Sequence, residues 1–178
     1  PVFGGCKDEI YLFADKANSV TLFEKYLGAD HPKSLIEAFK RNPNTFWYGP
    51  AGLVNYRADR TDEQVYALLR HQIAHHLFNE WQGSPALPAW LDEGFAELIE
   101  YRMTGESRGF CYQGSNSGGE APDKHYQGKG WKIWVAKLVE EKKSVPFERL
   151  LDKGVDGLSA QQLAQSWSLV RFFLDEHR

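Results

Sequence analysis

Two histidines stand four residues apart in the segment Leu69–His76, and acidic residues follow in the segment Trp90–Glu97. If the first segment is helical, His71 and His75 lie on one face about one turn apart, so both imidazoles can reach a single metal ion. Two ligands alone hold zinc weakly. Glu93 is the candidate third ligand, and a His2Glu set leaves a fourth position open for water or substrate, as in catalytic zinc sites.

The residues around these positions resemble the gluzincin metallopeptidases, whose pattern is His-Glu-x-x-His followed on a second helix by Glu, often within Trp-Leu-x-Glu-Gly-x-Ala. The second part of the pattern matches at Trp90, Leu91, Glu93, Gly94 and Ala96. The chain looks closest to small bacterial peptidase-MA-like domains of unknown function, and residues 61–104 carry most of the resemblance. The resemblance implies a zincin-like α+β fold, bound zinc and hydrolysis of peptide bonds in a peptide or protein substrate.

By this resemblance, His71, His75 and Glu93 are the zinc ligands. Glu97 follows Glu93 by one helical turn and would accept a hydrogen bond from a ligand histidine, which would fix the tautomer of that imidazole. In related peptidases an aromatic residue near the C-terminal helix, usually tyrosine, stabilises the developing oxyanion. Leu163 stands at the related position here.

Gln72 stands where the resemblance places the catalytic glutamate. In such a peptidase that glutamate takes the proton of the attacking water and passes it to the leaving amine. An amide can orient water but has no basic lone pair at neutral pH, and a positioned acid or base contributes about 10² to 10⁴ in rate. Two explanations remain open: an engineered glutamate-to-glutamine trap, or a natural pseudopeptidase that keeps its metal.

A second departure, at Leu163, favours the natural explanation, because a deliberate knockout needs only the glutamine. Losing an oxyanion donor would lower the rate by a further factor of roughly 10² to 10³. Tyr126 from the glycine-rich segment is the candidate replacement donor, with His125 and Tyr112 as alternatives. The metal-holding half of the pattern is therefore complete, whereas the proton-handling and oxyanion positions are both altered.

The elements that position these residues follow from periodicity and capping signals. Thr61 and Gln64 form a capping box that begins a helix running to about Trp81, and a second helix opens at Leu87–Trp90 and continues to about Met103. Upstream, residues 1–60 show strand patterns at 10–13, 45–48 and 53–57, of which the first suits a buried strand, and helical patterns at 19–27 and 32–41. We expect a small N-terminal sheet ahead of the two motif helices.

Residues 105–130 are rich in glycine and predict a long loop or lid. Helices are predicted at 131–143 and 161–177, with Trp131, Trp134 and Trp167 in the core. The whole chain, 1–178, is thus predicted to form one α+β domain that ends in a helical part.

Composition excludes several classes of protein. The chain has 178 residues, 42% hydrophobic and 14% aromatic, which is enough for one folded domain. The net charge of −3 and the absence of a dense basic cluster argue against a nucleic-acid partner. No apolar run approaches the ~20 residues needed to span a membrane. The start at Pro1 suggests a removed leader and an exported protein, while the oligomeric state stays open.

Two cysteines, Cys6 and Cys111, could form one disulfide or remain free, and they are too few for a cysteine-based zinc site. His76 points about 100° away from His75 and is expected to be packed or partly exposed. Asp92 and Glu100 are interpreted as solvated helix charge.

The strand at 53–57 has two interpretations. It is either an ordinary sheet edge or an edge beside the zinc that pairs with an extended peptide. A peptide-binding or regulatory module that uses the same cleft without catalysis is therefore the alternative function.

Overall fold

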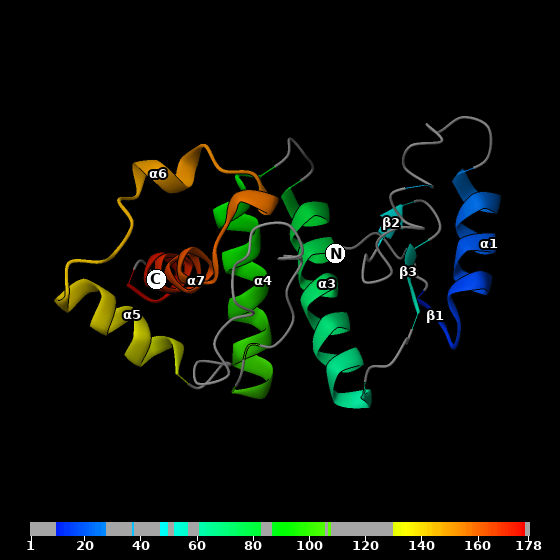
Figure 1. Ribbon diagram of the computed structural model, residues 1–178, viewed down its shortest axis with the longest axis horizontal. Helices are drawn as coiled ribbons and strands as arrows, with labels where there is room; N and C mark the ends of the chain where they lie inside the picture. The colour runs from blue at the N-terminus through cyan, green and yellow to red at the C-terminus, as the bar shows by residue number, and fades with distance from the viewer. Residues whose placement is uncertain are drawn as a thin grey trace. The chain divides into compact units, whose positions relative to one another are not determined.

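The computed structural model describes residues 10–27, 37, 47–49, 52–56, 61–82, 87–105, 107 and 130–176 (Figure 1). Contacts divide the chain into two compact units, Pro1–Val65 and Tyr66–Arg178, and each is described by itself. The expectation of one domain over the whole chain stays a prediction. No helix among the described residues is long and apolar enough to cross a membrane.

The first unit contains a three-stranded sheet and a helix. Its described elements are β1 (Ile10–Phe13), α1 (Lys16–Leu27), β2 (Trp47–Gly49) and β3 (Gly52–Tyr56). The strand order is β1-β3-β2; β1 runs parallel to β3, and β2 runs antiparallel to it. Asp15 accepts the backbone N–H of Asn18 at 2.9 Å, so the carboxylate satisfies one of the unpaired donors at the start of α1.

Two expectations about these strands were wrong. The strand 53–57 does not offer a free edge to a peptide, because β3 is the middle strand and its two sides pair with β1 and β2. The strand at 10–13 forms but is not buried, since Ile10 and Leu12 are 48% and 47% exposed. Of the helix expected at 32–41, the structure describes only Glu37, which is helical.

The second unit is helical in its described part. Its elements are α3 (Asp62–Gln82, which begins just before the division), α4 (Ala89–Thr104), α5 (Trp131–Glu140), α6 (Glu148–Leu151), the 3-10 helix η2 (Val155–Gly157) and α7 (Ala160–Glu176). The helices α3 and α4 lie side by side, and α4 crosses and packs against α7 (green and red in Figure 1). The expected helical part is therefore present.

Helix ends follow sequence signals. The capping box of Thr61 and Gln64 is confirmed: the Thr61 N–H donates to Gln64 Oε1 at 2.9 Å, and the Gln64 N–H donates to Thr61 Oγ1 at 3.3 Å. Ser159 and Gln162 form the same reciprocal pair at the start of α7. Gly105 ends α4 with a φ of +74°, and its N–H donates to the Tyr101 carbonyl.

The core of the second unit is built around large rings, as expected. Trp131 and Trp167 are fully buried and meet edge to face at 6.2 Å, while Trp134 is partly buried against the same cluster. Leu163 is also fully buried in this cluster. The position compared with the oxyanion tyrosine therefore belongs to the core.

Gly94 is required by the close approach of α4 to α7. A Cβ atom at Gly94 would lie 2.6 Å from the Ser166 carbonyl oxygen and 2.9 Å from Val170 Cγ2. We expect Gly94→Ala to lower the free energy of unfolding by about 1 to 3 kcal/mol, because a backbone oxygen cannot rotate away. Chemical denaturation measures this loss.

The matched control is Gly154→Ala, since a Cβ there meets no atom within 4 Å. Alanine stabilises an α-helix by about 1 kcal/mol relative to glycine. A Gly94→Ala protein that is more stable than the unaltered chain would therefore show that α4 and α7 can move apart at little cost.

Candidate metal centre

His71 and His75 on α3 meet Glu93 on α4 inside the second unit, as the sequence predicted. The two Nε2 atoms lie 3.1 Å apart. Glu93 Oε2 lies 3.4 Å from His71 Nε2, and Glu93 Oε1 lies 3.4 Å from His75 Nε2. All three side chains are buried. The pair of imidazoles and the carboxylate thus converge on one point between the two helices.

The spacing of these atoms fits a bound metal ion. Zinc bonds of about 2.0 to 2.1 Å at tetrahedral angles put neighbouring ligand atoms about 3.3 Å apart. The three measured separations, 3.1, 3.4 and 3.4 Å, fall close to that value. Two imidazole nitrogens and a carboxylate suit a divalent transition metal. The buried residues His71, His75 and Glu93 could therefore hold a metal ion.

Asp92 supports His75 from the side away from the other two ligands. Its Oδ1 lies 2.9 Å from His75 Nδ1, and the carboxylate is 27% exposed. Burial, the largest single influence, lowers the pKa of His75, but the close contact with Asp92 and the charges of Glu93 and Asp92 outweigh it and raise that pKa. An imidazole that donates through Nδ1 keeps its Nε2 lone pair for a metal.

The opposite nitrogen of His71 faces two further buried carboxylates. His71 Nδ1 lies 3.8 Å from Glu97 Oε1 and 4.0 Å from Glu100 Oε2. Ser107 donates its hydroxyl to Glu97 Oε2, while Glu97 Oε1 has no hydrogen-bond partner among the described residues. Glu97, expected beside a ligand histidine, is thus near His71, at a distance longer than a hydrogen bond.

His71, Glu97 and Glu100 also form a second group that could hold an ion. Its measured separations from His71 Nδ1, 3.8 and 4.0 Å, exceed the tetrahedral zinc spacing of about 3.3 Å. Burial lowers the pKa of His71, which favours the neutral imidazole that a metal needs. We therefore assign the tighter His71, His75 and Glu93 group as the candidate centre.

Three buried carboxylates, those of Glu93, Glu97 and Glu100, gather around His71. Burial raises the pKa of Glu97 well above its usual value, and the charges of Glu100 and Glu93 raise it further. A divalent cation beside Glu93 would offset part of this repulsion. The charge distribution is therefore consistent with a cation site.

The interpretation of Asp92 and Glu100 as solvated charge was wrong. Glu100 is buried, and Asp92 contacts His75. The physical reason is that α4 packs against α3 on one side and α7 on the other, so few positions on α4 face solvent. The missed signal was the direct adjacency of Asp92 to Glu93, because each ligand histidine needs an outer acceptor.

The structure describes two of the other candidate residues, Gln72 and His76. Gln72 is buried, and His76 is partly buried, as expected for a packed histidine. Outside the described residues lie the proposed oxyanion donor Tyr126, the alternatives His125 and Tyr112, and both cysteines, Cys6 and Cys111.

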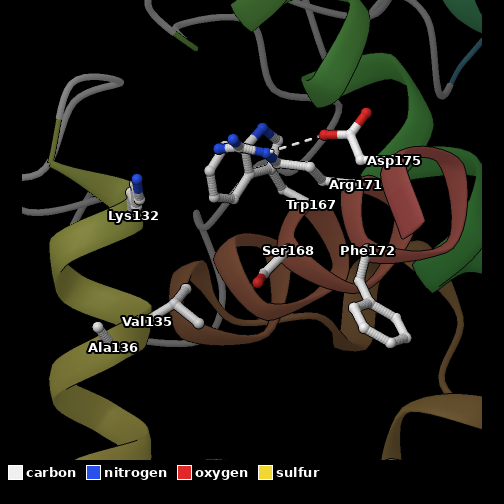
Figure 2. Close-up of a pocket in the computed structure, with 8 residues that line it drawn as sticks. All are labelled: Lys132, Val135, Ala136, Trp167, Ser168, Arg171, Phe172 and Asp175. Atoms are coloured by element: carbon white, nitrogen blue, oxygen red, sulfur yellow. Dashed lines mark hydrogen bonds and ion pairs between the residues drawn. The ribbon is translucent and has the colours of Figure 1, made fainter.

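A hollow of about 320 Å³ lies between α5 and α7, and none of the candidate metal ligands lines it. Figure 2 shows Arg171 beside the Trp167 ring, with the guanidinium carbon 5.6 Å from the ring centroid. The Arg171 Nε donates to Asp175 at 3.3 Å, and Asp175 also binds Arg102 at 2.6 Å. These contacts join α7 to itself and to α4, so they serve packing.

We expect Asp92→Asn to weaken metal binding about 10- to 100-fold, because the loss of an outer carboxylate leaves His75 less basic and less well oriented. Calorimetric titration of zinc into the metal-free protein measures the change. Glu148→Gln, which neutralises an exposed carboxylate on α6, is the control and should leave the affinity unchanged. Equal zinc affinities of Asp92→Asn and Glu148→Gln would show that Asp92 does not support the metal ligands.

Comparisons of the chain with protein-family models, with curated proteins and with solved structures find no match.

Proposed function

We propose that this chain is a zinc-binding, gluzincin-like peptidase domain of zincin-like α+β fold, with Gln72 at the position of the general base. The observation that supports it best is the buried triangle of two Nε2 atoms and the Glu93 carboxylate, with sides of 3.1 to 3.4 Å. The motif around Glu93 and the position of the histidines one turn apart on α3 add to this support.

Each residue then has a defined task. When bound, zinc would polarise the substrate carbonyl and make a water acidic enough to react near neutral pH. His71, His75 and Glu93 would hold the ion, and Asp92 would keep the Nδ1 proton of His75 in place. Gln72 would orient the water by hydrogen bonding, but its amide cannot accept the proton. The chain as it stands would therefore bind a peptide and cleave it slowly or not at all.

The alternative is a non-catalytic peptide-binding or regulatory module that uses the same centre. Gln72 is the observation that favours it, because a binding module has no need of a base. Both functions require the same metal ligands. They differ in whether a glutamate in place of Gln72 would restore peptide cleavage.

Metal content and peptide cleavage of this chain, compared with Gln72→Glu, test the proposal. Zinc in both proteins and cleavage only by the variant support a peptidase disabled at Gln72. Zinc in both and cleavage by neither support the binding module. Absence of zinc from both proteins overturns the metal centre itself.

A further inference from the structure

A hollow of about 420 Å³ adjoins the candidate metal centre, because Asp92 and Glu93 line it. Its lining includes residues 87–89, at the N-terminal end of α4, and residues 151–155, which begin at the last residue of α6. A volume of this order is within the range of small-molecule sites. A group held at the metal centre would therefore lie next to this hollow.

The lining combines apolar surface with three carboxylates, those of Asp92, Glu93 and Asp152. Leu87, Ala89 and Val155 are partly buried and supply apolar surface. Asp152 is exposed and forms no ion pair with another described residue. Lys153, its neighbour, donates its ammonium to the Gly157 carbonyl at 2.9 Å and keeps its positive charge, but the three lining carboxylates outnumber this one lining cation. The hollow thus offers hydrophobic contact along its sides and a negative charge at its rim.

We propose that this hollow is the subsite for the substrate side chain next to the scissile bond, and that it prefers lysine or arginine there. This proposal rests on the peptidase-like function proposed above. Lysine and arginine bury an aliphatic stem along apolar surface and keep the charged head in water. The stem would lie along Leu87 and Val155 while the head approaches Asp152. An aliphatic side chain would gain only the first contact, and an acidic one would be repelled.

Peptide binding by the zinc-loaded chain tests this, since Gln72 should leave the peptide intact. The probes are fluorescent hexapeptides that are identical except for arginine, leucine or glutamate at one position, moved through the sequence in turn. We expect arginine to bind most tightly and glutamate least tightly at one of these positions. Asp152→Asn should weaken the arginine peptide by about two- to five-fold, as for an exposed ion pair, and Glu148→Gln should not.

Gly154→Phe tests the volume of the hollow separately from its charge. Gly154 lines the hollow, and a side chain there meets no atom within 4 Å of its Cβ, so the variant should fold. We expect it to weaken binding of the arginine and leucine peptides by roughly 10-fold or more, because the phenyl ring would occupy space that the substrate side chain needs.

The outcomes separate this proposal from the function on which it rests. Binding that is equal for all three peptides and unchanged by Gly154→Phe overturns the subsite and leaves the peptide-binding function in place. Failure of every peptide to bind the zinc-loaded protein overturns the proposed function as well. A preference for arginine that Asp152→Asn removes supports the subsite.

Discussion

Glu93→Gln is expected to abolish stoichiometric zinc binding. The Glu93 carboxylate is the only acidic member of the tighter group and faces both Nε2 atoms at 3.4 Å. An uncharged amide of the same shape removes the charge and one strong ligand atom. The loss should exceed the roughly 10- to 100-fold effect of removing an outer partner. Elemental analysis of the purified variant against the unaltered chain measures the bound zinc.

Thermal unfolding gives a second measurement of the same loss. A ligand that binds only the folded state stabilises it by about 4.1 kcal/mol when its concentration is 1,000 times the dissociation constant. Zinc should therefore raise the melting temperature of the unaltered chain and leave that of Glu93→Gln unchanged. A variant that melts normally without zinc but no longer responds to zinc separates loss of metal from loss of fold.

Glu100→Gln is the control that distinguishes the two candidate metal groups. Glu100 belongs to the group with separations of 3.8 and 4.0 Å and not to the tighter one. If Glu100→Gln loses the metal while Glu93→Gln keeps it, the ion lies on the Nδ1 side of His71, and our assignment is wrong.

The local parts of this site could be predicted from the sequence. Helical periodicity and a capping box predict α3, and a spacing of four residues then puts His71 and His75 on one face. The interpretation of Glu93 as their partner needed the further assumption that α3 and α4 are neighbours, which the resemblance supplied. These predictions depend on contacts within one helix or between consecutive helices.

The parts that were missed depend on contacts between distant segments. The burial of Glu100 follows from the packing of α4, and the packing of α7 against α4 involves residues far along the chain, such as Ser166 and Val170 beside Gly94. The central position of β3 follows from its parallel pairing with β1, across a connection that contains α1. Neither pairing leaves a periodic signal in the segment itself. The charge of Glu100 therefore suggested that its side chain is exposed to solvent, and the strand pattern at 53–57 suggested an edge strand.

Gln72→Glu is expected to raise peptide cleavage by the zinc-loaded chain by about 10² to 10⁴-fold. Gln72 is buried and adjoins His71 on α3, so a carboxylate there would be partly desolvated. Burial raises the pKa of a carboxyl group toward neutrality, where a general base works best. A quenched fluorescent peptide measures the rate, and the double variant Gln72→Glu, His75→Ala is the control that should be inactive.

The size of the increase reports on the oxyanion position. Leu163 is buried in the core and cannot donate a hydrogen bond, so activity would stay roughly 10² to 10³-fold below that of a complete site if no other donor exists. Tyr126→Phe in the Gln72→Glu background tests the candidate donor. A drop of that size assigns the role to Tyr126, whereas full activity excludes it. A Gln72→Glu protein that keeps its zinc but cleaves no peptide would instead support the binding module, because restoring the base alone would not have restored turnover.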